Sequence, residues 1–240
     1  MKALILCAGL GTRLRPLTEK TPKPLLLING KPLLSYHLES LYKYGVRDIL
    51  INTHYLAEQI EDFVKKNEDK FAGLSIKTVF EKNLLGSAGT LKANSVFFAG
   101  EDDFLIVYGD NLTNINYKKL LTVHKNKAGI ATIASYIEEH PESKGIIGFN
   151  EDDEIYKFVE KPKPEQVISN YANAGMYVLN HRIFKYLNGV DKTPLDFGYD
   201  IFPTLLDIKE SMYVYKMNEF LLDIGTLESY TKAQDIQLSL

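Results

Sequence analysis

The chain has 240 residues, of which 45% are hydrophobic and 25% are charged, and its formal net charge is −3. These values are typical of one globular domain with a sizeable core, and they argue against a protein that binds nucleic acid through bulk positive charge. The single cysteine, Cys7, lies in an apolar run and excludes a disulfide framework.

The opening residues, MKALILC, carry one positive charge and a short apolar stretch, so they do not predict a signal peptide. No apolar run approaches the length of a transmembrane helix. We therefore expect a cytoplasmic protein that binds neither membrane nor nucleic acid. The sequence leaves the oligomeric state open, and a homo-oligomer is compatible with it.

Strand and helix patterns alternate through the first 137 residues, which predicts a parallel α/β sheet. The predicted strands are Ala3–Leu6, Asp48–Asn52, Ser75–Phe80, Phe104–Tyr108 and Ile130–Ile137. The predicted helices are Pro32–Tyr44, Ala57–Lys66, Ser87–Val96 and Tyr117–Lys127. The first helix has its leucines on one face, and Gly45 follows as a stop signal.

The rhythm changes after Gly145, where short segments predict an antiparallel or mixed elaboration of the sheet. Its predicted strands are Gly145–Asn150, Glu154–Glu160, Tyr171–Leu179 and Met212–Met217, and its predicted helices are Tyr199–Lys209 and Thr226–Gln237. No linker separates the two regions. We therefore expect one domain over 1–240, with a first half of about 1–135 and a second half of about 136–240.

Gly9 and Gly11 follow the first strand directly. Ligands of open α/β sheets bind at the carboxyl ends of strands, and glycines there let backbone N–H groups approach phosphate oxygens. The loop lacks the G-x-x-x-x-G-K-[ST] pattern of a P-loop. It also lacks the dinucleotide-binding pattern, because Leu14 occupies the position of the third glycine.

Basic residues follow this loop. Thr12, Arg13 and Arg15 offer a hydroxyl group and two cations suited to a triphosphate. Lys23 stands between two prolines that stiffen the backbone around it, which suggests a positive charge aimed at a reacting phosphoryl group. The alternative is an ordinary basic loop that faces solvent.

Gly9-Leu10-Gly11-Thr12-Arg13 together with Pro22-Lys23-Pro24 resembles the signature of the sugar-phosphate nucleotidyltransferases, the nucleotide-sugar pyrophosphorylases. The resemblance extends to about Tyr230. It implies an enzyme that transfers a nucleotidyl group from a nucleoside triphosphate to a sugar 1-phosphate, with release of pyrophosphate. The implied fold is a single-domain, Rossmann-like α/β fold, in which a mixed, mostly parallel sheet is flanked by helices and carries an antiparallel sugar-binding elaboration. The first half would bind the nucleotide and the second half the sugar phosphate.

The resemblance also assigns residues. Arg13 and Lys23 would balance charge on the transferred phosphoryl group and the pyrophosphate. Asp110, in Tyr-Gly-Asp-Asn, and Asp223, in Asp-Ile-Gly-Thr, would bind Mg²⁺, whereas each taken alone is typical of a turn or a helix cap. These four residues are the predicted catalytic set. The predicted nucleotide-binding residues are Leu6, Ala8, Gly9, Gly11, Thr12, Arg13, Glu81 and Gly86.

Two later segments bear on the choice of substrate. Glu81 stands where relatives read the nucleobase, and a carboxylate accepts hydrogen bonds only, which favours guanine and GTP. The predicted sugar-phosphate residues are Gly145, Glu160, Lys161 and Asn173, which could instead be polar residues of a surface sheet.

The stretch TPKPLLLINGKPLL (21–34) looks most like mannose-1-phosphate guanylyltransferases and their heptose-specific relatives, so mannose 1-phosphate is the favoured acceptor. Thymidylyl, uridylyl or cytidylyl transfer, to glucose 1-phosphate or to another acceptor such as phosphocholine, stays an alternative. A non-catalytic regulatory homologue is a second alternative. It predicts loss of one of the four catalytic residues, and all four are present.

Overall fold

A computed structural model describes residues 1–238 of the chain. The chain folds as two compact units. Unit 1 is built from Met1–Leu84, Val107–Asn116 and the chain from Glu219 onward, and unit 2 from Leu85–Ile106 and Tyr117–Asn218. Strand β6 (Asp103–Tyr108) carries the chain from unit 2 into unit 1.

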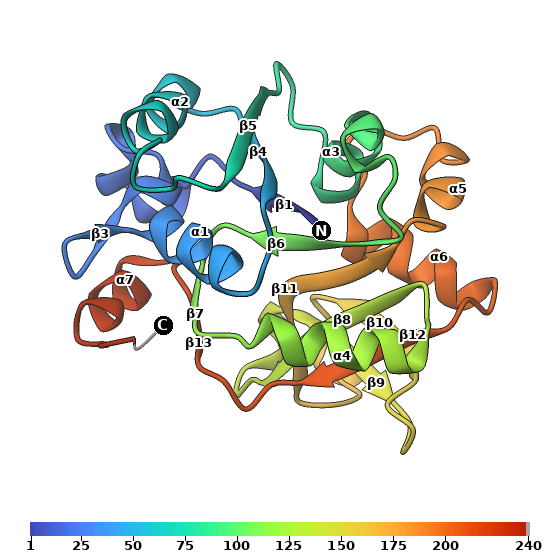
Figure 1. Cartoon of the computed structure of the whole chain (residues 1–240). Helices are drawn as coiled ribbons and strands as arrows, with labels where there is room; N and C mark the ends of the chain where they lie inside the picture. The colour runs from blue at the N-terminus through green and yellow to red at the C-terminus, as the bar shows by residue number, and fades with distance from the viewer. Residues whose placement is uncertain (239–240) are drawn as a thin grey trace. The chain divides into compact units, whose positions relative to one another are not determined.

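Unit 1 contains three parallel strands, in the order β1, β4, β5, with α1 and α2 beside them (Figure 1). The strands are β1 (Lys2–Leu6), β4 (Asp48–Thr53) and β5 (Ser75–Phe80), and the helices are α1 (Leu33–Lys43) and α2 (Ala57–Lys66). The middle residues of β1 and β4 are almost fully buried, as expected for apolar parallel strands that are covered on both faces.

Helix α1 ends where the sequence predicts. Gly45 adopts a φ of +86°, and the N–H group of Val46 donates to the carbonyl of Leu41 at 3.0 Å. The Gly45 N–H group donates to Tyr42 at 3.1 Å, which completes a Schellman motif. The chain is thereby turned into β4.

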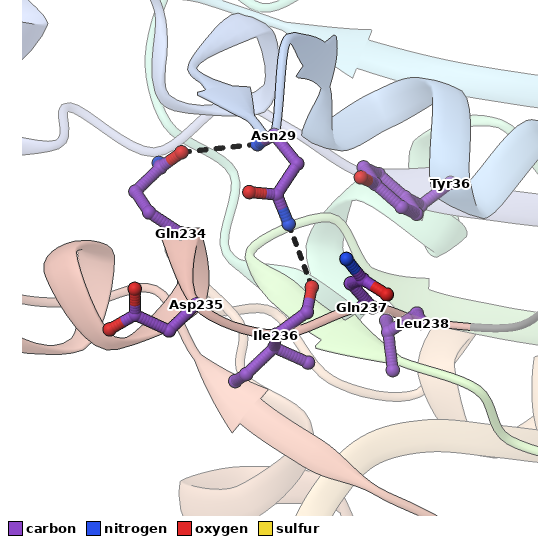
Figure 2. A pocket seen from close by; sticks show the side chains of 7 residues that line it. All are labelled: Asn29, Tyr36, Gln234, Asp235, Ile236, Gln237 and Leu238. Carbon is purple, nitrogen blue, oxygen red and sulfur yellow. Dashed lines mark hydrogen bonds between the residues drawn. The ribbon is translucent and has the colours of Figure 1, made fainter.

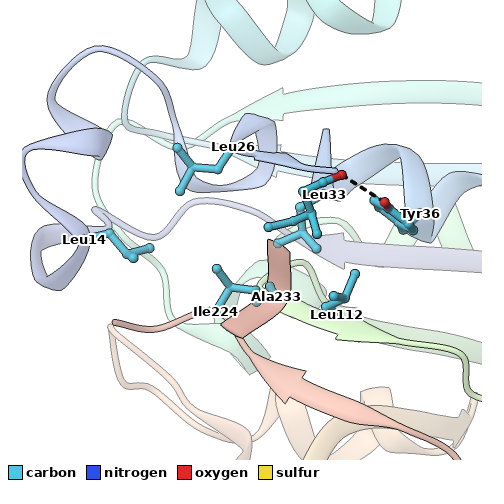
Figure 3. Close-up of a cluster of buried hydrophobic side chains, with 8 residues drawn as sticks. Leu14, Leu26, Leu33, Tyr36, Leu112, Ile224 and Ala233 are labelled. Carbon is cyan, nitrogen blue, oxygen red and sulfur yellow. Dashed lines mark hydrogen bonds between the residues drawn. The ribbon is translucent and has the colours of Figure 1, made fainter. Parts of the chain in front are cut away.

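Two short ribbons complete unit 1: β2 (Leu27–Ile28) pairs with β3 (Lys31–Pro32), and β7 (Asn111–Thr113) pairs with β13 (Leu221–Asp223). Helix α7 (Leu227–Gln234) follows β13. Side chains from β2, β7, α7 and the chain around β13 meet those of α1 and the N-terminal loops in one apolar cluster (Figure 3). The cluster consists of Leu14, Leu26, Ile28, Leu33, Tyr36, Leu112, Ile224 and Ala233. It anchors the C-terminal segment to the N-terminal loops.

The chain after α7 lies against the β2–β3 turn (Figure 2). Asn29 donates its backbone N–H to the Gln234 side chain at 3.1 Å and its side-chain amide to the Ile236 carbonyl at 2.7 Å. A cavity of about 390 Å³ lies beside these contacts and is also lined by Tyr36. The predicted last helix therefore ends earlier, at Gln234, because the next residues bond to this turn.

Unit 2 contains a mixed sheet in the order β10, β9, β11, β8, β12, in which only the β8–β12 pair is parallel. The strands are β8 (Ala131–Ile137), β9 (Gly145–Phe149), β10 (Ile155–Glu160), β11 (Tyr171–Asn180) and β12 (Met212–Lys216). The helices are α3 (Ser87–Ala93), α4 (Tyr117–Lys127), α5 (Ile183–Asn188) and α6 (Phe202–Asp207).

The α/β class, with parallel strands first and mainly antiparallel pairing later, confirms the expected fold. Besides the end of the last helix, three local points differ from the expectation. Helix α5 was not predicted. The helix predicted from Tyr199 begins with a π-helical turn at Phe197, because the Asp196 carboxylate caps the N–H groups of Gly198 and Tyr199. Helix α3 ends at Ala93 and gives way to a 3-10 turn, Ser95–Phe98. Within residues 1–238, none of the helices is long and apolar enough to span a bilayer.

Candidate active site

The glycine loop leaves β1 and turns through short 3-10 segments. Gly11 has a φ of +64°, and a Cβ atom there would lie 2.9 Å from the Thr18 side chain. The Thr18 hydroxyl donates to the Gly11 carbonyl at 2.7 Å, so the close approach holds the loop in place. Gly9 has open space around it. After Gly11 the first 3-10 turn begins, Thr12–Leu14, in which Thr12 and Arg13 are exposed.

A backbone hydrogen bond joins the end of β1 to the residue that follows β6. The N–H group of Gly109 donates to the carbonyl of Leu6 at 3.0 Å, and a Cβ atom on Gly109 would lie 2.7 Å from the Cys7 sulfur. Cys7 and Ala8 are buried. Burial raises the pKa of the Cys7 thiol well above its usual range, and Asp110 adds to the effect, so Cys7 is a packing residue.

Lys23 brings the two predicted metal carboxylates together. Its ammonium nitrogen lies 2.8 Å from Asp110 Oδ2 and 3.7 Å from Asp223 Oδ1. The lysine side chain is only 11% exposed, while the two carboxylates keep 38% and 26% of their surface. The proline-flanked lysine is therefore a partly buried cation and not a charge on a solvent-facing loop.

The β7–β13 ribbon explains why Asp110 and Asp223 meet. Asp223 pairs with Asn111 in the antiparallel register, and the N–H group of Ile224 donates to the Asp110 carbonyl at 2.9 Å. Leu112 and Ile224 belong to the apolar cluster of unit 1, which fixes both strands of the ribbon. Packing thus places two carboxylates from distant segments on one cation.

Arg13 reaches the same place. A Cβ atom on Gly225 would lie 3.1 Å from Arg13 Nη2 and 3.1 Å from Asp223 Oδ1. The glycine of the Asp-Ile-Gly-Thr motif therefore leaves room for a guanidinium group beside a carboxylate. All four predicted catalytic residues lie in unit 1, with Lys23 against the two aspartates and Arg13 beside Gly225.

His37 lies beneath the Gly109–Asp110 turn and is 2% exposed. Burial lowers the pKa of His37 to about 4, against the opposing effects of the nearby Asp110 charge and a hydrogen bond to Gly109. Its Nε2 atom has no hydrogen-bond partner among residues 1–238. His37 is therefore neutral near pH 7.

Glu81 follows β5 and is 4% exposed. Its carboxylate accepts a hydrogen bond from the Asn52 amide at 2.9 Å, and its backbone carbonyl accepts one from His54 at 2.7 Å. Glu81 is thus held at the ends of β4 and β5. Sequence reasoning placed Asn52 at the end of a predicted strand and missed its contact with Glu81, which becomes visible from the strand register.

Gly86 belongs to unit 2 and has a φ of +81°. A Cβ atom there would clash with the backbone of Leu195, whose carbonyl accepts hydrogen bonds from the N–H groups of Ala88 and Gly89, each at 3.0 Å. Close packing of two backbones therefore requires a glycine at this position.

The predicted sugar-phosphate residues lie in unit 2. Gly145 of β9 pairs with Glu160 of β10, and the Glu160 carboxylate occupies space that a side chain at Gly145 or Gly198 would fill. Burial raises the pKa of Glu160, and the charge of Asp196 adds to this effect. Sequence reasoning missed Asp196 and Gly198, whose only signal is the turn-forming sequence Asp-Phe-Gly.

Asn173 lies where the register of β11 against β8 is interrupted. Gly175 has a φ of +70° and donates its N–H group to Asn173 Oδ1 at 2.9 Å, while Asn173 Nδ2 donates to the Tyr177 hydroxyl at 2.8 Å. This interruption is a β-bulge, and its two hydrogen bonds fix the direction of the Asn173 side-chain amide. Lys161 directly follows Glu160, has a φ of +47° and is exposed.

Residues 2–239 match the family model described as nucleotidyl transferase, and the chain belongs to this family. It is 34% identical to the mannose-1-phosphate guanylyltransferase catalytic subunit beta of Drosophila pseudoobscura pseudoobscura, over 99% of the chain and 62% of that relative. It is also 34% identical to a UTP–glucose-1-phosphate uridylyltransferase of Synechocystis sp., over 97% of the chain and 62% of that protein. The chain thus spans about three-fifths of the length of these relatives.

Solved structures of similar length share the fold. A structure described as a putative glucose-1-phosphate thymidylyltransferase of Bacillus anthracis superposes with a TM-score of 0.86 at 24% identity, covering 100% of this chain and 98% of that one. HddC of Yersinia pseudotuberculosis, solved in complex with GMP-PN, has a TM-score of 0.78 at 27% identity, with 98% of each chain covered.

Proposed function

We propose that the chain transfers a nucleotidyl group from a nucleoside triphosphate to a sugar 1-phosphate and releases pyrophosphate. The observation that carries the proposal is the position of the Lys23 ammonium group. It lies 2.8 Å from Asp110 Oδ2 and 3.7 Å from Asp223 Oδ1. A phosphate oxygen of the sugar 1-phosphate attacks the α-phosphorus in line, so positioning and charge balance supply most of the catalysis and no covalent intermediate on the enzyme is needed.

The donor set fits a magnesium ion. Mg²⁺ prefers oxygen ligands and is commonly held by one or two carboxylates together with substrate phosphates. Asp110 and Asp223 are two partly exposed carboxylates that already share one cation. Among residues 1–238 no group of three or more acidic, histidine or cysteine side chains could hold a metal, so phosphate oxygens and water would complete its coordination. When bound, the ion would offset negative charge on the phosphates.

Each half of the chain has a role in this proposal. The residues up to about 135 bind the nucleotide through Leu6, Ala8, Gly9, Gly11, Thr12, Arg13, Glu81 and Gly86. The residues from about 136 bind the sugar phosphate through Gly145, Glu160, Lys161 and Asn173. Arg13 and Lys23 balance charge on the phosphoryl groups. The buried Glu160 carboxylate and the fixed Asn173 amide would accept and donate hydrogen bonds to sugar hydroxyls, and the exposed Lys161 would pair with the sugar's phosphate.

We favour GTP and mannose 1-phosphate as the substrates. Guanine offers adjacent N–H donors, and Glu81 offers only acceptors. The guanylyltransferase among the relatives and the GMP-PN complex of HddC support this choice. The uridylyltransferase of equal identity keeps UTP and glucose 1-phosphate as the competing pair. We place the reaction in the cytoplasm, where nucleoside triphosphates are abundant.

A matrix of GTP, UTP, dTTP, CTP and ATP against mannose, glucose and heptose 1-phosphates, with phosphocholine as a further acceptor, tests the function through pyrophosphate release. We expect the highest kcat/KM for GTP with mannose 1-phosphate. Treatment with EDTA should abolish pyrophosphate release for every pair. Glu160→Gln should raise the KM for the sugar phosphate and leave the KM for the nucleotide unchanged. Absence of pyrophosphate from every pair would support a non-catalytic homologue instead.

A further inference from the structure

Asn52 links the glycine loop to the proposed base-reading residue. The backbone N–H of Cys7, just before the loop, donates to Asn52 Oδ1 at 2.7 Å, and Asn52 Nδ2 donates to Glu81 Oε1 at 2.9 Å. Asn52 is 3% exposed and Glu81 is 4% exposed, so both bonds are made in the protein interior. Such buried bonds are costly to break, because the separated groups have no water to replace their partners.

The direction of the Asn52 amide follows from chemistry. A backbone N–H group can only donate, so the Asn52 atom that faces Cys7 must be the oxygen. The amide nitrogen, a donor only, must then face Glu81. The backbone of Glu81 is fixed as well, because its N–H group donates to Thr53 at 2.8 Å and its carbonyl accepts from His54 at 2.7 Å.

We infer that Asn52 is a positioning residue that sets the hydrogen-bonding polarity of the side chain at position 81 and thereby selects a base that offers donors. This inference rests on the proposed function, in which Glu81 reads the base. The amide of Asn52 requires an acceptor in the place of Glu81 Oε1. With glutamate at position 81, the second atom, Oε2, is also an acceptor, and its two lone pairs can take donors of guanine beside other partners.

The same rule predicts an amide reversal in two single variants. In Glu81→Gln, the Gln carbonyl oxygen must face Asn52, so the Gln amide nitrogen takes the place of Oε2 and presents donors to donors of guanine. In Asn52→Asp, the bond from Cys7 is retained, but two buried carboxyl groups then face each other and share one proton, so Glu81 Oε1 loses its fixed amide donor. Both variants should lose selectivity for guanine.

The double variant Asn52→Asp/Glu81→Gln restores the pattern. The Asp carboxylate accepts from Cys7 and from the Gln amide nitrogen, and the Gln carbonyl oxygen then takes the place of Oε2. One carboxylate and one amide are present, as in the wild type, but with their positions exchanged. The double variant should therefore discriminate better than either single variant, which independent losses would not produce.

The readout is the ratio of kcat/KM for GTP to that for ITP, which lacks the 2-amino group, together with calorimetric affinities for both nucleotides without acceptor. Each single variant should lower both ratios about tenfold, the loss of one good base contact. On a logarithmic scale, the double variant should recover at least half of the fall in the GTP-to-ITP ratio that the single variants show. If the double variant is no better than the worse single variant, Asn52 has only a structural role.

Thermal unfolding identifies variants that do not fold. If Asn52→Asp is unfolded, Asn52→Ser decides, since serine has no amide and its hydroxyl is too short to reach Cys7 or Glu81; a wild-type ratio would overturn the inference. An unchanged ratio in Glu81→Gln would instead overturn the assignment of Glu81 as the base reader, while pyrophosphate release by the wild type would still support the transferase. The two failures are thus distinguishable.

Discussion

Lys23 and Asp110 stand 87 residues apart in the sequence, and their side chains form an ion pair of 2.8 Å. The lysine is held by a 3-10 turn, Lys23–Leu25, and the aspartate by the turn between β6 and β7. Asp223 approaches the same ammonium group at 3.7 Å. Because Lys23 and the two aspartates neutralise one another, removal of the Lys23 charge should lower turnover in the proposed reaction and tighten the binding of a metal ion.

Lys23→Met should lower kcat by about 10²- to 10³-fold, by analogy with the loss of one donor that stabilises transition-state charge. Steady-state pyrophosphate release measures the change. Lys20→Met, an exposed lysine in the same loop region, is the matched control and should keep wild-type turnover. Equal turnover in the two variants would reduce Lys23 to a structural ion pair.

The same Lys23→Met variant should bind a divalent metal more tightly than the wild type in the absence of nucleotide. Two unit charges 4 Å apart interact with about 1 kcal/mol even at the dielectric constant of water, so removal of the Lys23 charge beside the two carboxylates should raise the metal affinity roughly fivefold. Titration with Mn²⁺, followed by electron paramagnetic resonance, gives the dissociation constants. Asp223→Asn should weaken binding, and weaker binding by Lys23→Met would contradict the prediction.

Gly225→Ala should impair activity without unfolding the chain. The new Cβ atom would stand 3.1 Å from Arg13 Nη2 and 3.1 Å from Asp223 Oδ1, so one of these groups must move. We expect at least a tenfold fall in kcat/KM, the effect of a small misplacement of reacting groups. Gly189→Ala meets only ordinary contacts and serves as the control for stability and activity.

His37 should make folding sensitive to acid. Its pKa is about 4 in the folded chain and 6.5 by reference, so the unfolded chain binds its proton first as the pH falls. The stability is fully present above pH 6.5 and is lost progressively towards pH 4, by roughly 3 kcal/mol in total. Urea unfolding of the wild type and His37→Leu at pH 7, 5.5 and 4.5 measures the difference. Parallel pH profiles would show that His37 is not the group responsible.

The sequence was sufficient for the elements that rest on local patterns. The parallel strands, helix α1 with its Gly45 stop, and the glycine loop all follow from residues that act within one segment. The contacts that complete the site were not predictable in this way. The Asn52–Glu81 bond depends on strand register, and the environment of Glu160 depends on Asp196, which lies in a turn with no helical or strand period.

The C-terminal correction has the same cause. The period of Thr226–Gln237 is helical, but α7 ends at Gln234 because the next residues bond to Asn29. Local propensity cannot anticipate a partner that lies about 200 residues earlier in the chain. The sequence motifs singled out Lys23, Asp110 and Asp223, but only the folded chain reveals that the Lys23 ammonium group pairs with both carboxylates.

The β7–β13 ribbon has a consequence for the order in which the chain matures during synthesis. Asp223 reaches Lys23 only when β13 pairs with β7, and Ile224 and Ala233 complete the apolar cluster of unit 1. A nascent chain that has emerged only as far as unit 2 therefore has the glycine loop but lacks one of its two carboxylates. Translation must pass Asp223 before this carboxylate can join Lys23 and Asp110, so under the proposed function a chain that stops earlier would lack a complete metal site.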